Sequence, residues 1–393
     1  MKMCPAGCDQ PYEFIAAVQS SKPVTVSVAL STRLELVLQE MTQRADQEQN
    51  IFIRVFLRFF AWVHRMDAKF GLPRPVTAPS MKKQRLFAII LLACQTGITF
   101  TGSLVRVTGS GLGCNTWPQC QPGSLFPTAG TIPWIHQLIE FGNRLLTFVV
   151  AAAAVVVFIA VIRAARRPAI LGLAFFQGIG IIIQAVLGGI SVHMDLMWWT
   201  VAMHFLPSML LVFLAARLVV RIGEPDDGSM QPLMPRPLQL LTNGSAASLA
   251  IVLFTGTLVT GAGPHAGDAA ILPENRLQVP LIDMAHIHAG FMYLYLGVTI
   301  GLLAGVFAMN LDHRIKTAAY WVIGACLLQA AVGIMQYWLG VPRWSVPMHV
   351  IGSGIVTAAT GFLWSLKARY MGGNAQLTGS TEADRQREAV LTA

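Results

Sequence analysis

Charged side chains are scarce in this chain: only 12% of its 393 residues are Asp, Glu, Lys or Arg, whereas 54% are hydrophobic. A soluble globular domain carries about 25% charged residues, so this composition excludes that class. The mean hydropathy of +0.58 is typical instead of a protein that crosses a membrane several times. We therefore expect an all-α polytopic membrane protein.

Acidic residues are scarcer than basic ones, 19 against 28, but this excess of positive charge does not indicate nucleic-acid binding. The basic residues alternate with long apolar segments, and about 20 apolar residues are enough to span a bilayer as a helix. Eight transmembrane helices are predicted, at residues 85–106, 134–162, 169–190, 198–220, 237–260, 280–309, 316–339 and 345–367.

Basic residues near the membrane concentrate on one side. Ten lie in the loops after the second, fourth and sixth spans and after the eighth: Arg163, Arg166, Arg167, Arg217, Arg221, Arg236, Arg314, Lys316, Lys367 and Arg369. The opposite loops carry three: Arg106, Arg276 and Arg343. Because cytoplasmic loops are enriched in Lys and Arg, both termini are predicted to be cytoplasmic.

Cysteine is also rare, with six residues in the chain. Cys94 and Cys326 lie within predicted spans and are expected to be packing residues. Cys114 and Cys120 lie in the first outer loop, which supplies too few ligands for a metal site. In an oxidising compartment a disulfide persists, so this pair predicts a structural or redox-sensitive disulfide.

A cleavable signal pattern is lacking in residues 1–80, which we expect to form an N-terminal cytoplasmic extension. Its basic amphipathic stretch, residues 51–62, is suited to lying on the inner leaflet. An equally weighted alternative is that the extension reflects a misassigned start, and that the native chain begins near Met66 or Met81. Residues 371–393 are predicted to be a disordered cytoplasmic tail.

The chain contains an internal repeat. Trp199-Thr-Val-Ala-Met-His204 matches Trp344-Ser-Val-Pro-Met-His349 at four of six positions, with an offset of 145 residues. Gln184-Ala-Val-Leu-Gly188 matches Gln329-Ala-Ala-Val-Gly333 with the same offset. In the first helices, Phe100-Thr-Gly-Ser-Leu-Val105 matches Phe254-Thr-Gly-Thr-Leu-Val259 with an offset of 154.

These offsets make spans one to four correspond to spans five to eight. We therefore predict two four-helix bundles, residues 81–224 and 225–370, related by a pseudo-twofold axis along the membrane normal. The first bundle is the expected substrate site and the second the expected cofactor site, for the reasons that follow.

Intramembrane histidines are costly and by default indicate function. In the second bundle, His288 and His349 are expected at one depth, where two imidazoles are suited to axial ligation of a haem iron. The alternative is that each histidine is only buried and hydrogen-bonded. His286 competes with His288, because residues two apart on a helix do not share a face. The repeat favours His288, which corresponds to Asn143 in the first bundle.

The first bundle differs at this position, since His204 is expected to face Asn143, and an amide is a poor haem ligand. Glu140 lies one turn from Asn143 on the same helix face. It is a candidate proton carrier or catalytic group, or alternatively the partner of Arg144 in a structural ion pair.

Two arginines lie at the outer ends of spans. Arg106 and Arg343 are suited to pairing with the propionates of a porphyrin, as arginine pairs with carboxylates generally. Their alternative role is to anchor the spans at the interface.

The first-loop sequence Leu104-Val-Arg-Val-Thr-Gly-Ser-Gly-Leu-Gly-Cys114, followed by Trp117-Pro-Gln-Cys120, resembles the signature of haem A synthase. Glu140-Phe-Gly-Asn-Arg-Leu resembles that family's second-helix Glu-x-x-His-Arg motif. The resemblance covers about residues 85–368. It implies an oxidoreductase that converts the C8 methyl of haem O to the formyl of haem A by two successive hydroxylations, using bound haem b.

The same resemblance implies roles for individual residues. His288 and His349 would hold haem b, His204 would lie at the substrate haem iron, and Glu140 would be the catalytic carboxylate. Cys114 and Cys120 would form the outer-loop disulfide.

Asn143 departs from the family, which mostly has histidine there. Either His204 alone binds the substrate iron, or the chemistry does not require a second histidine. The mirror-image assignment, with the cofactor in the first bundle, is disfavoured for the same reason.

The resemblance also implies a place in the cell and a set of partners. The expected location is the plasma membrane. The expected partners are haem O synthase, cytochrome oxidase assembly factors and membrane lipid. The sequence is also compatible with a homo-oligomer, but it does not determine the oligomeric state.

Two other functions remain open. A b-type cytochrome that only transfers electrons would need a symmetric second haem site, and Asn143 with Glu140 argues against one. A haem or small-molecule transporter is compatible with parallel repeats, but fixed axial ligands would slow release.

Overall fold

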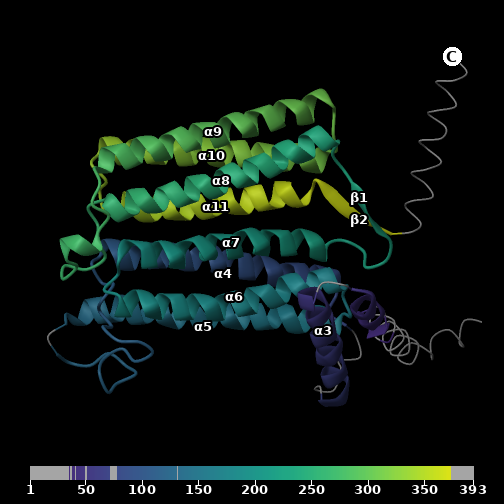
Figure 1. Cartoon of the computed structure of the whole chain (residues 1–393), viewed down its shortest axis with the longest axis horizontal. Helices are drawn as coiled ribbons and strands as arrows, with labels where there is room; N and C mark the ends of the chain where they lie inside the picture. The colour runs from purple at the N-terminus through teal and green to yellow at the C-terminus, as the bar shows by residue number, and fades with distance from the viewer. Residues whose placement is uncertain are drawn as a thin grey trace, which may run out of the picture. The chain divides into compact units, whose positions relative to one another are not determined.

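The computed structural model describes residues 35, 38–39, 41–48, 51–70, 78–130 and 132–372. Eight of its helices are long and apolar enough to cross a membrane. They are α4 (Met81–Val107), α5 (Trp134–Arg163), α6 (Pro168–His193), α7 (Trp198–Ile222), α8 (Arg236–Ala262), α9 (Leu281–Ala308), α10 (His313–Trp338) and α11 (Ser345–Ser365). The protein is therefore a polytopic helical membrane protein, as predicted (Figure 1).

Local backbone chemistry ends several of these helices. Asn310 and Gly340 adopt left-handed φ angles of 47° and 71° just after α9 and α10, which stops the helical path. Asp312 then begins α10, because its side chain accepts a hydrogen bond from the main-chain N–H of Arg314. Pro168 is the first residue of α6, where a missing N–H costs nothing.

The helices pack within and between the two predicted halves. In the second half α8 contacts α9, α9 contacts α10, and α10 contacts α11. Between the halves, α7 contacts α11, α4 contacts α11, and α8 contacts α7. The first helix of each half thus meets the fourth helix of the other. The pseudo-twofold relation itself stays a prediction.

The interior of the first half contains a polar chain. The buried Gln95 donates to Gln177, which donates to the carbonyl of Leu211, both over 3.0 Å. The repeat offsets place Leu249, Val322 and Val356 at these positions, and all three belong to the apolar core of the second half.

The second half has its own polar contacts deeper in the bundle. The Tyr295 hydroxyl lies 2.8 Å from Thr360 Oγ1, and Ser245 Oγ lies 3.2 Å from Thr299 Oγ1. The corresponding residues of the first half are apolar and buried: Val150, Ala215, Leu91 and Ala154. Each half therefore contains its own buried polar contacts, at places where the other half is apolar.

The loops at one end of the bundle are joined across the two halves. The N–H of Gly111 donates to the carbonyl of Gly267 over 2.8 Å, which links the α4–α5 loop to the α8–α9 loop. His265 Nε2 lies 2.8 Å from the carbonyl of Val341, which links the latter loop to the α10–α11 loop. These links gather the three loops at the ends of the helices that carry the candidate site.

The opposite end contains the part of the fold that the all-α expectation missed. β1 (Ser229–Pro232) and β2 (Ala368–Met371) form an antiparallel two-stranded sheet. The two strands follow α7 and α11, beyond the apolar spans. Their backbone N–H and C=O groups have no helical partners there, and pairing between β1 and β2 satisfies them. The predicted tail lies outside the described residues from position 373 onward.

The chain divides into two compact units, Met1–Ser80 with Ile159–Leu171, and Met81–Phe158 with Gly172–Ala393. In the first unit, α3 (Ile51–Phe70) includes the predicted amphipathic stretch. Leu57, Phe60 and Ala61 are buried on α3, whereas Val55 and Trp62 are exposed. The stretch is therefore helical, while its position on a membrane and the start-site alternative stay predictions.

Candidate functional site

Two histidines face each other inside the second half. His288 on α9 and His349 on α11 have ring centroids 6.3 Å apart and an interplanar angle of 67°. Each ring packs against a glycine of a neighbouring helix. A Cβ at Gly256 would lie 3.2 Å from Cε1 of His288, and one at Gly333 would lie 3.1 Å from Cε1 of His349. Glycine at these positions leaves room for the imidazoles.

Hydrogen bonds fix these side chains further. His288 Nδ1 lies 3.1 Å from the Thr255 hydroxyl, which restricts the rotation of the ring. Gln329 Nε2 donates to the main-chain carbonyl of His349 over 2.7 Å, while Nδ1 of His349 is buried without a hydrogen-bond partner among the described residues. This nitrogen lies on the side of the ring that packs against Gly333, so it is a buried polar atom that the described structure leaves unsatisfied.

The spacing of the rings fits an iron between them. An iron that binds one nitrogen of each imidazole at about 2 Å would separate the centroids by roughly 6 Å, because each centroid lies about 1.2 Å behind its nitrogen. The observed 6.3 Å agrees with that arrangement. The separation of the two rings is therefore compatible with an iron held between His288 and His349.

His286 lies on a different face of α9. Its ring is exposed and packs near Tyr337, with centroids 6.3 Å apart. The structure thus brings His288, and not His286, to His349. The two-residue spacing on a helix explains the difference, because it turns the side chains about 200° apart.

The corresponding residues of the first half repeat one contact with a different side chain. The Thr101 hydroxyl donates to Oδ1 of Asn143 over 2.7 Å, in the place of the contact between Thr255 and His288. Asn143 therefore occupies the position that the repeat assigned to it. It offers an amide where the second half offers an imidazole.

His204 is placed on α7 much as His349 is on α11. A Cβ at Gly188 would lie 3.3 Å from Cε1 of His204, which matches the contact of Gly333 with His349. Nδ1 of His204 and both amide atoms of Gln184 are buried without hydrogen-bond partners in the described part of the chain. The sequence analysis used Gln184 only to align the repeats, so it did not identify this unsatisfied amide.

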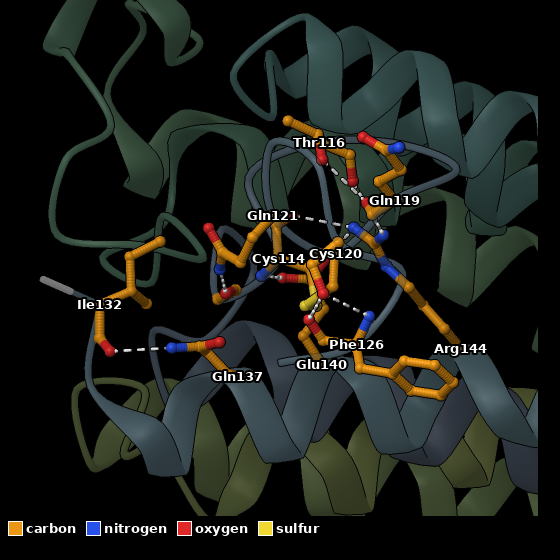
Figure 2. The surroundings of a disulfide bond; sticks show 12 residues. Cys114, Thr116, Gln119, Cys120, Gln121, Phe126, Ile132, Gln137, Glu140 and Arg144 are labelled. Atoms are coloured by element: carbon orange, nitrogen blue, oxygen red, sulfur yellow. Dashed lines mark hydrogen bonds and ion pairs between the residues drawn. A yellow bond between two sulfur atoms is a disulfide. The ribbon is translucent and has the colours of Figure 1, made fainter. Parts of the chain in front are cut away.

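Glu140 and Arg144 form a buried ion pair at the start of α5. Arg144 Nη2 lies 2.5 Å from Oε1 of Glu140, and their side chains are 18% and 7% exposed. The second carboxylate oxygen accepts the main-chain N–H of Cys114 over 2.6 Å. The ion pair that the sequence left as an alternative is therefore present, and it is connected to the α4–α5 loop (Figure 2).

Arg144 also binds the loop directly. Its guanidinium donates to the carbonyls of Cys114, Thr116 and Gln119 over 2.8 to 3.1 Å. Figure 2 shows Arg144 reaching from α5 into the loop closed by the Cys114–Cys120 disulfide. The predicted disulfide is thus present. The loop is docked on α5 by a charged side chain whose contacts with main-chain carbonyls left no sequence signal.

A buried glutamine fastens the rest of this loop. Gln137, one turn before Glu140, accepts the N–H of Thr128 and donates to the carbonyls of Thr128 and Ile132, all over 3.0 Å. Gln121 donates to the carbonyl of Gly113 over 2.9 Å. The sequence analysis missed Gln137; its position one turn from Glu140 was the available signal.

A carboxylate of the second half lies near this ion pair. The contact between Gly111 and Gly267 brings Asp268 within electrostatic reach of Glu140. Gly267 has a φ of 111°, a conformation that favours glycine. The first-half loop is therefore packed against a loop of the opposite half.

The two arginines proposed as propionate partners are placed differently. Arg106 donates to the carbonyl of Thr260 at the end of α8 over 3.0 Å, and Arg276 donates to Thr260 and Gly261. Arg343 is exposed, and it makes no hydrogen bond or ion pair among the described residues. Arg106 thus has a structural partner, whereas Arg343 remains free for a ligand.

Comparison with known proteins places this arrangement in a family. Residues 85–360 match the COX15-CtaA model, described as cytochrome oxidase assembly protein. A heme A synthase of Bacillus pumilus is 27% identical over 271 residues, which cover 64% of this chain and 84% of that protein. A heme A synthase of Listeria monocytogenes is 32% identical over 149 residues, 37% of this chain and 48% of that protein. One of Lysinibacillus sphaericus is 31% identical over 195 residues, 48% of this chain and 60% of that protein. The chain therefore belongs to the COX15-CtaA family of cytochrome oxidase assembly proteins.

Proposed function

We propose that this protein is a haem A synthase, an oxidoreductase that converts the C8 methyl of haem O to a formyl group by successive hydroxylations. The observation that carries the proposal is the difference between its two halves. One half pairs two histidines, while the other pairs Asn143 with Thr101 next to a buried Glu140–Arg144 ion pair. The relatives named heme A synthase support the same activity.

In this proposal His288 and His349 hold haem b. Bound there, haem b supplies one-electron redox chemistry. Thr255 orients His288, and Gln329 holds the backbone of α11 at His349. Gly256 and Gly333 leave the space in which both rings keep their orientation.

The substrate haem O belongs in the first half, with its iron at His204. Gly188 leaves space for the His204 ring. The hydrogen bond from Thr101 restricts the rotation of the Asn143 side chain. Arg343 has no partner among the described residues and is suited to a propionate of either haem. In this proposal the residues that surround the substrate come from α4, α5, α6 and α7.

Glu140 is the proposed acid–base group. The second hydroxylation yields a hydrated aldehyde, whose loss of water needs one hydroxyl to lose a proton and the other to gain one. A carboxylate oxygen has free lone pairs even when it accepts one hydrogen bond, so Glu140 keeps the capacity to move that proton. Arg144 fixes the orientation of the Glu140 carboxylate through the ion pair and links it to the disulfide loop through hydrogen bonds to loop carbonyls.

The protein is a multi-pass membrane protein. We further propose that it resides in the plasma membrane with both termini cytoplasmic, which the distribution of Lys and Arg supports. Haem O synthase would supply the substrate and cytochrome oxidase assembly factors would receive the product. A homo-oligomer is compatible with this role.

Expression in a host that makes haem O but no haem A tests the activity. Extracted haems are separated and weighed by mass spectrometry. Under aerobic conditions the wild type is expected to yield haem A, and Glu140→Gln, which keeps the size of the side chain, is expected to yield little or none. Recovery of haem b and haem O alone from the folded wild type would favour a b-type cytochrome and overturn the proposal.

A further inference from the structure

A cluster of positive charge lies at the end of the bundle opposite the disulfide loop. It consists of Arg217 on α7, Asn243 on α8, and Trp364 and Lys367 at the end of α11; we call it the Trp364 cluster. The Arg217 Cζ lies 4.3 Å and the Lys367 Nζ 3.6 Å from the Trp364 ring centroid. Asn243 Oδ1 accepts from Trp364 Nε1 over 3.0 Å and from Lys367 Nζ over 2.6 Å.

These two cations lack a neutralising acid. Arg221 lies nearby but forms its own ion pair with Glu224, at 2.6 Å. Within the described ranges, neither Arg217 nor Lys367 forms an ion pair, and the only hydrogen-bond acceptor of Lys367 Nζ is the neutral amide of Asn243. Partial burial, and then the charges of Arg217 and Arg221, lower the pKa of Lys367. The cluster therefore holds the positive charges of Arg217 and Lys367 close together. Because like charges repel, this arrangement would be more stable with an anion bound between them.

The repeat provides an internal comparison. By the repeat offsets, Arg217 corresponds to Phe362 and Asn243 corresponds to Ile89. Trp364 corresponds to Val219, and Lys367 corresponds to Ile222. The corresponding junction of α4, α7 and α11 is thus wholly apolar. The fold does not require charge at such a junction, so the Trp364 cluster is a special feature of one side.

The surface next to the cluster is apolar toward the middle of the span. Phe213 and Leu210 lie four and seven residues before Arg217, on the same face of α7. The Phe213 ring lies 5.8 Å from that of Trp364, and Leu210 is 55% exposed. The charged cluster is thus adjacent to an apolar strip, formed by Phe213 and Leu210, on the membrane-spanning part of α7.

We propose that the Trp364 cluster binds the phosphate of an anionic membrane lipid, with an acyl chain of that lipid along Phe213 and Leu210. Arg217 and Lys367 supply the charge, and Trp364 holds both cations at the depth of the headgroup. The apolar strip distinguishes a lipid from free phosphate. This site is independent of the proposed haem chemistry.

Native mass spectrometry of the full chain tests the proposal. The protein is titrated with phosphatidylglycerol and with phosphatidylcholine of the same acyl chains. The wild type is expected to prefer phosphatidylglycerol. Each cation near a membrane surface contributes enough that Arg217→Gln or Lys367→Gln should weaken phosphatidylglycerol binding about fivefold, and the double variant about thirtyfold. The charge-conserving variants Arg217→Lys and Lys367→Arg should retain most of the affinity.

The matched control is Arg236→Gln, which removes an exposed arginine from the same end of the bundle. It should leave the affinity unchanged; an equal loss would mean general surface electrostatics and would overturn the site. Brominated phosphatidylglycerol should quench the wild-type tryptophan fluorescence more than that of Trp364→Phe. Displacement of the lipid by millimolar inorganic phosphate, or equal binding of phosphatidylcholine, would refute an anionic-lipid site.

Discussion

Substituting Arg144 by methionine tests whether the ion pair holds the disulfide loop on α5. The change keeps an unbranched chain but removes the 2.5 Å contact with Glu140 and the three bonds to loop carbonyls. Breaking a buried pair by removing one partner costs about 3–5 kcal/mol. The loop carbonyls can bond to water once exposed, so we take about 3 kcal/mol as the expected change in the free energy of loop opening.

Amide hydrogen exchange at the main-chain N–H of Cys114 measures this change in the free energy of loop opening. The N–H of Cys114 donates to Glu140, so its exchange requires the loop to open. About 3 kcal/mol corresponds to exchange accelerated roughly 150-fold in Arg144→Met. Arg163→Met makes the same substitution at the other end of α5 and should leave the Cys114 amide unchanged.

A double-mutant cycle with Glu140→Gln separates the ion pair from the carbonyl bonds. If the pair acts as a unit, the double variant should be less perturbed than the sum of the single variants, by about 1–3 kcal/mol. Strictly additive effects, or unchanged exchange in Arg144→Met, would refute the reasoning that the pair anchors the loop.

Three further changes have distinct expected outcomes. His288→Ala should abolish a low-spin b-type haem spectrum in the purified protein, whereas His286→Ala should preserve it; the opposite result would exchange their roles. Asn143→His should raise the haem retained per chain, measured by pyridine haemochrome assay, because it places an imidazole where the second half has one; an unchanged ratio would contradict this. Tyr295→Phe removes the 2.8 Å bond to Thr360 and should lower the free energy of unfolding by about 1 kcal/mol, measured by thermal unfolding in detergent, with no change expected in the haem spectrum.

The sequence was informative where physical constraints act along a single helix. Hydropathy located eight spans because a bilayer demands long apolar helices, and the boundaries agree with the structure within a few residues. The repeat aligned Asn143 with His288. The structure agrees with this alignment, because each of the two side chains contacts the equivalent threonine of its own half. Spacing of four residues was enough to suggest the pair of Glu140 and Arg144.

Contacts between segments far apart in the chain were decided only by tertiary structure. Hydrogen bonds from Arg144 to loop carbonyls depend on backbone atoms, which every residue shares, so no residue type announces them. The sequence suggested that Arg106 pairs with a propionate or anchors its span at the interface, whereas in the structure Arg106 donates to the end of α8. The Trp364 cluster brings together side chains of three helices, and no spacing along one helix predicts that Arg217 and Lys367 lie on the same tryptophan ring. One-dimensional periodicity therefore determined which helices exist, whereas three-dimensional packing decided which polar groups meet.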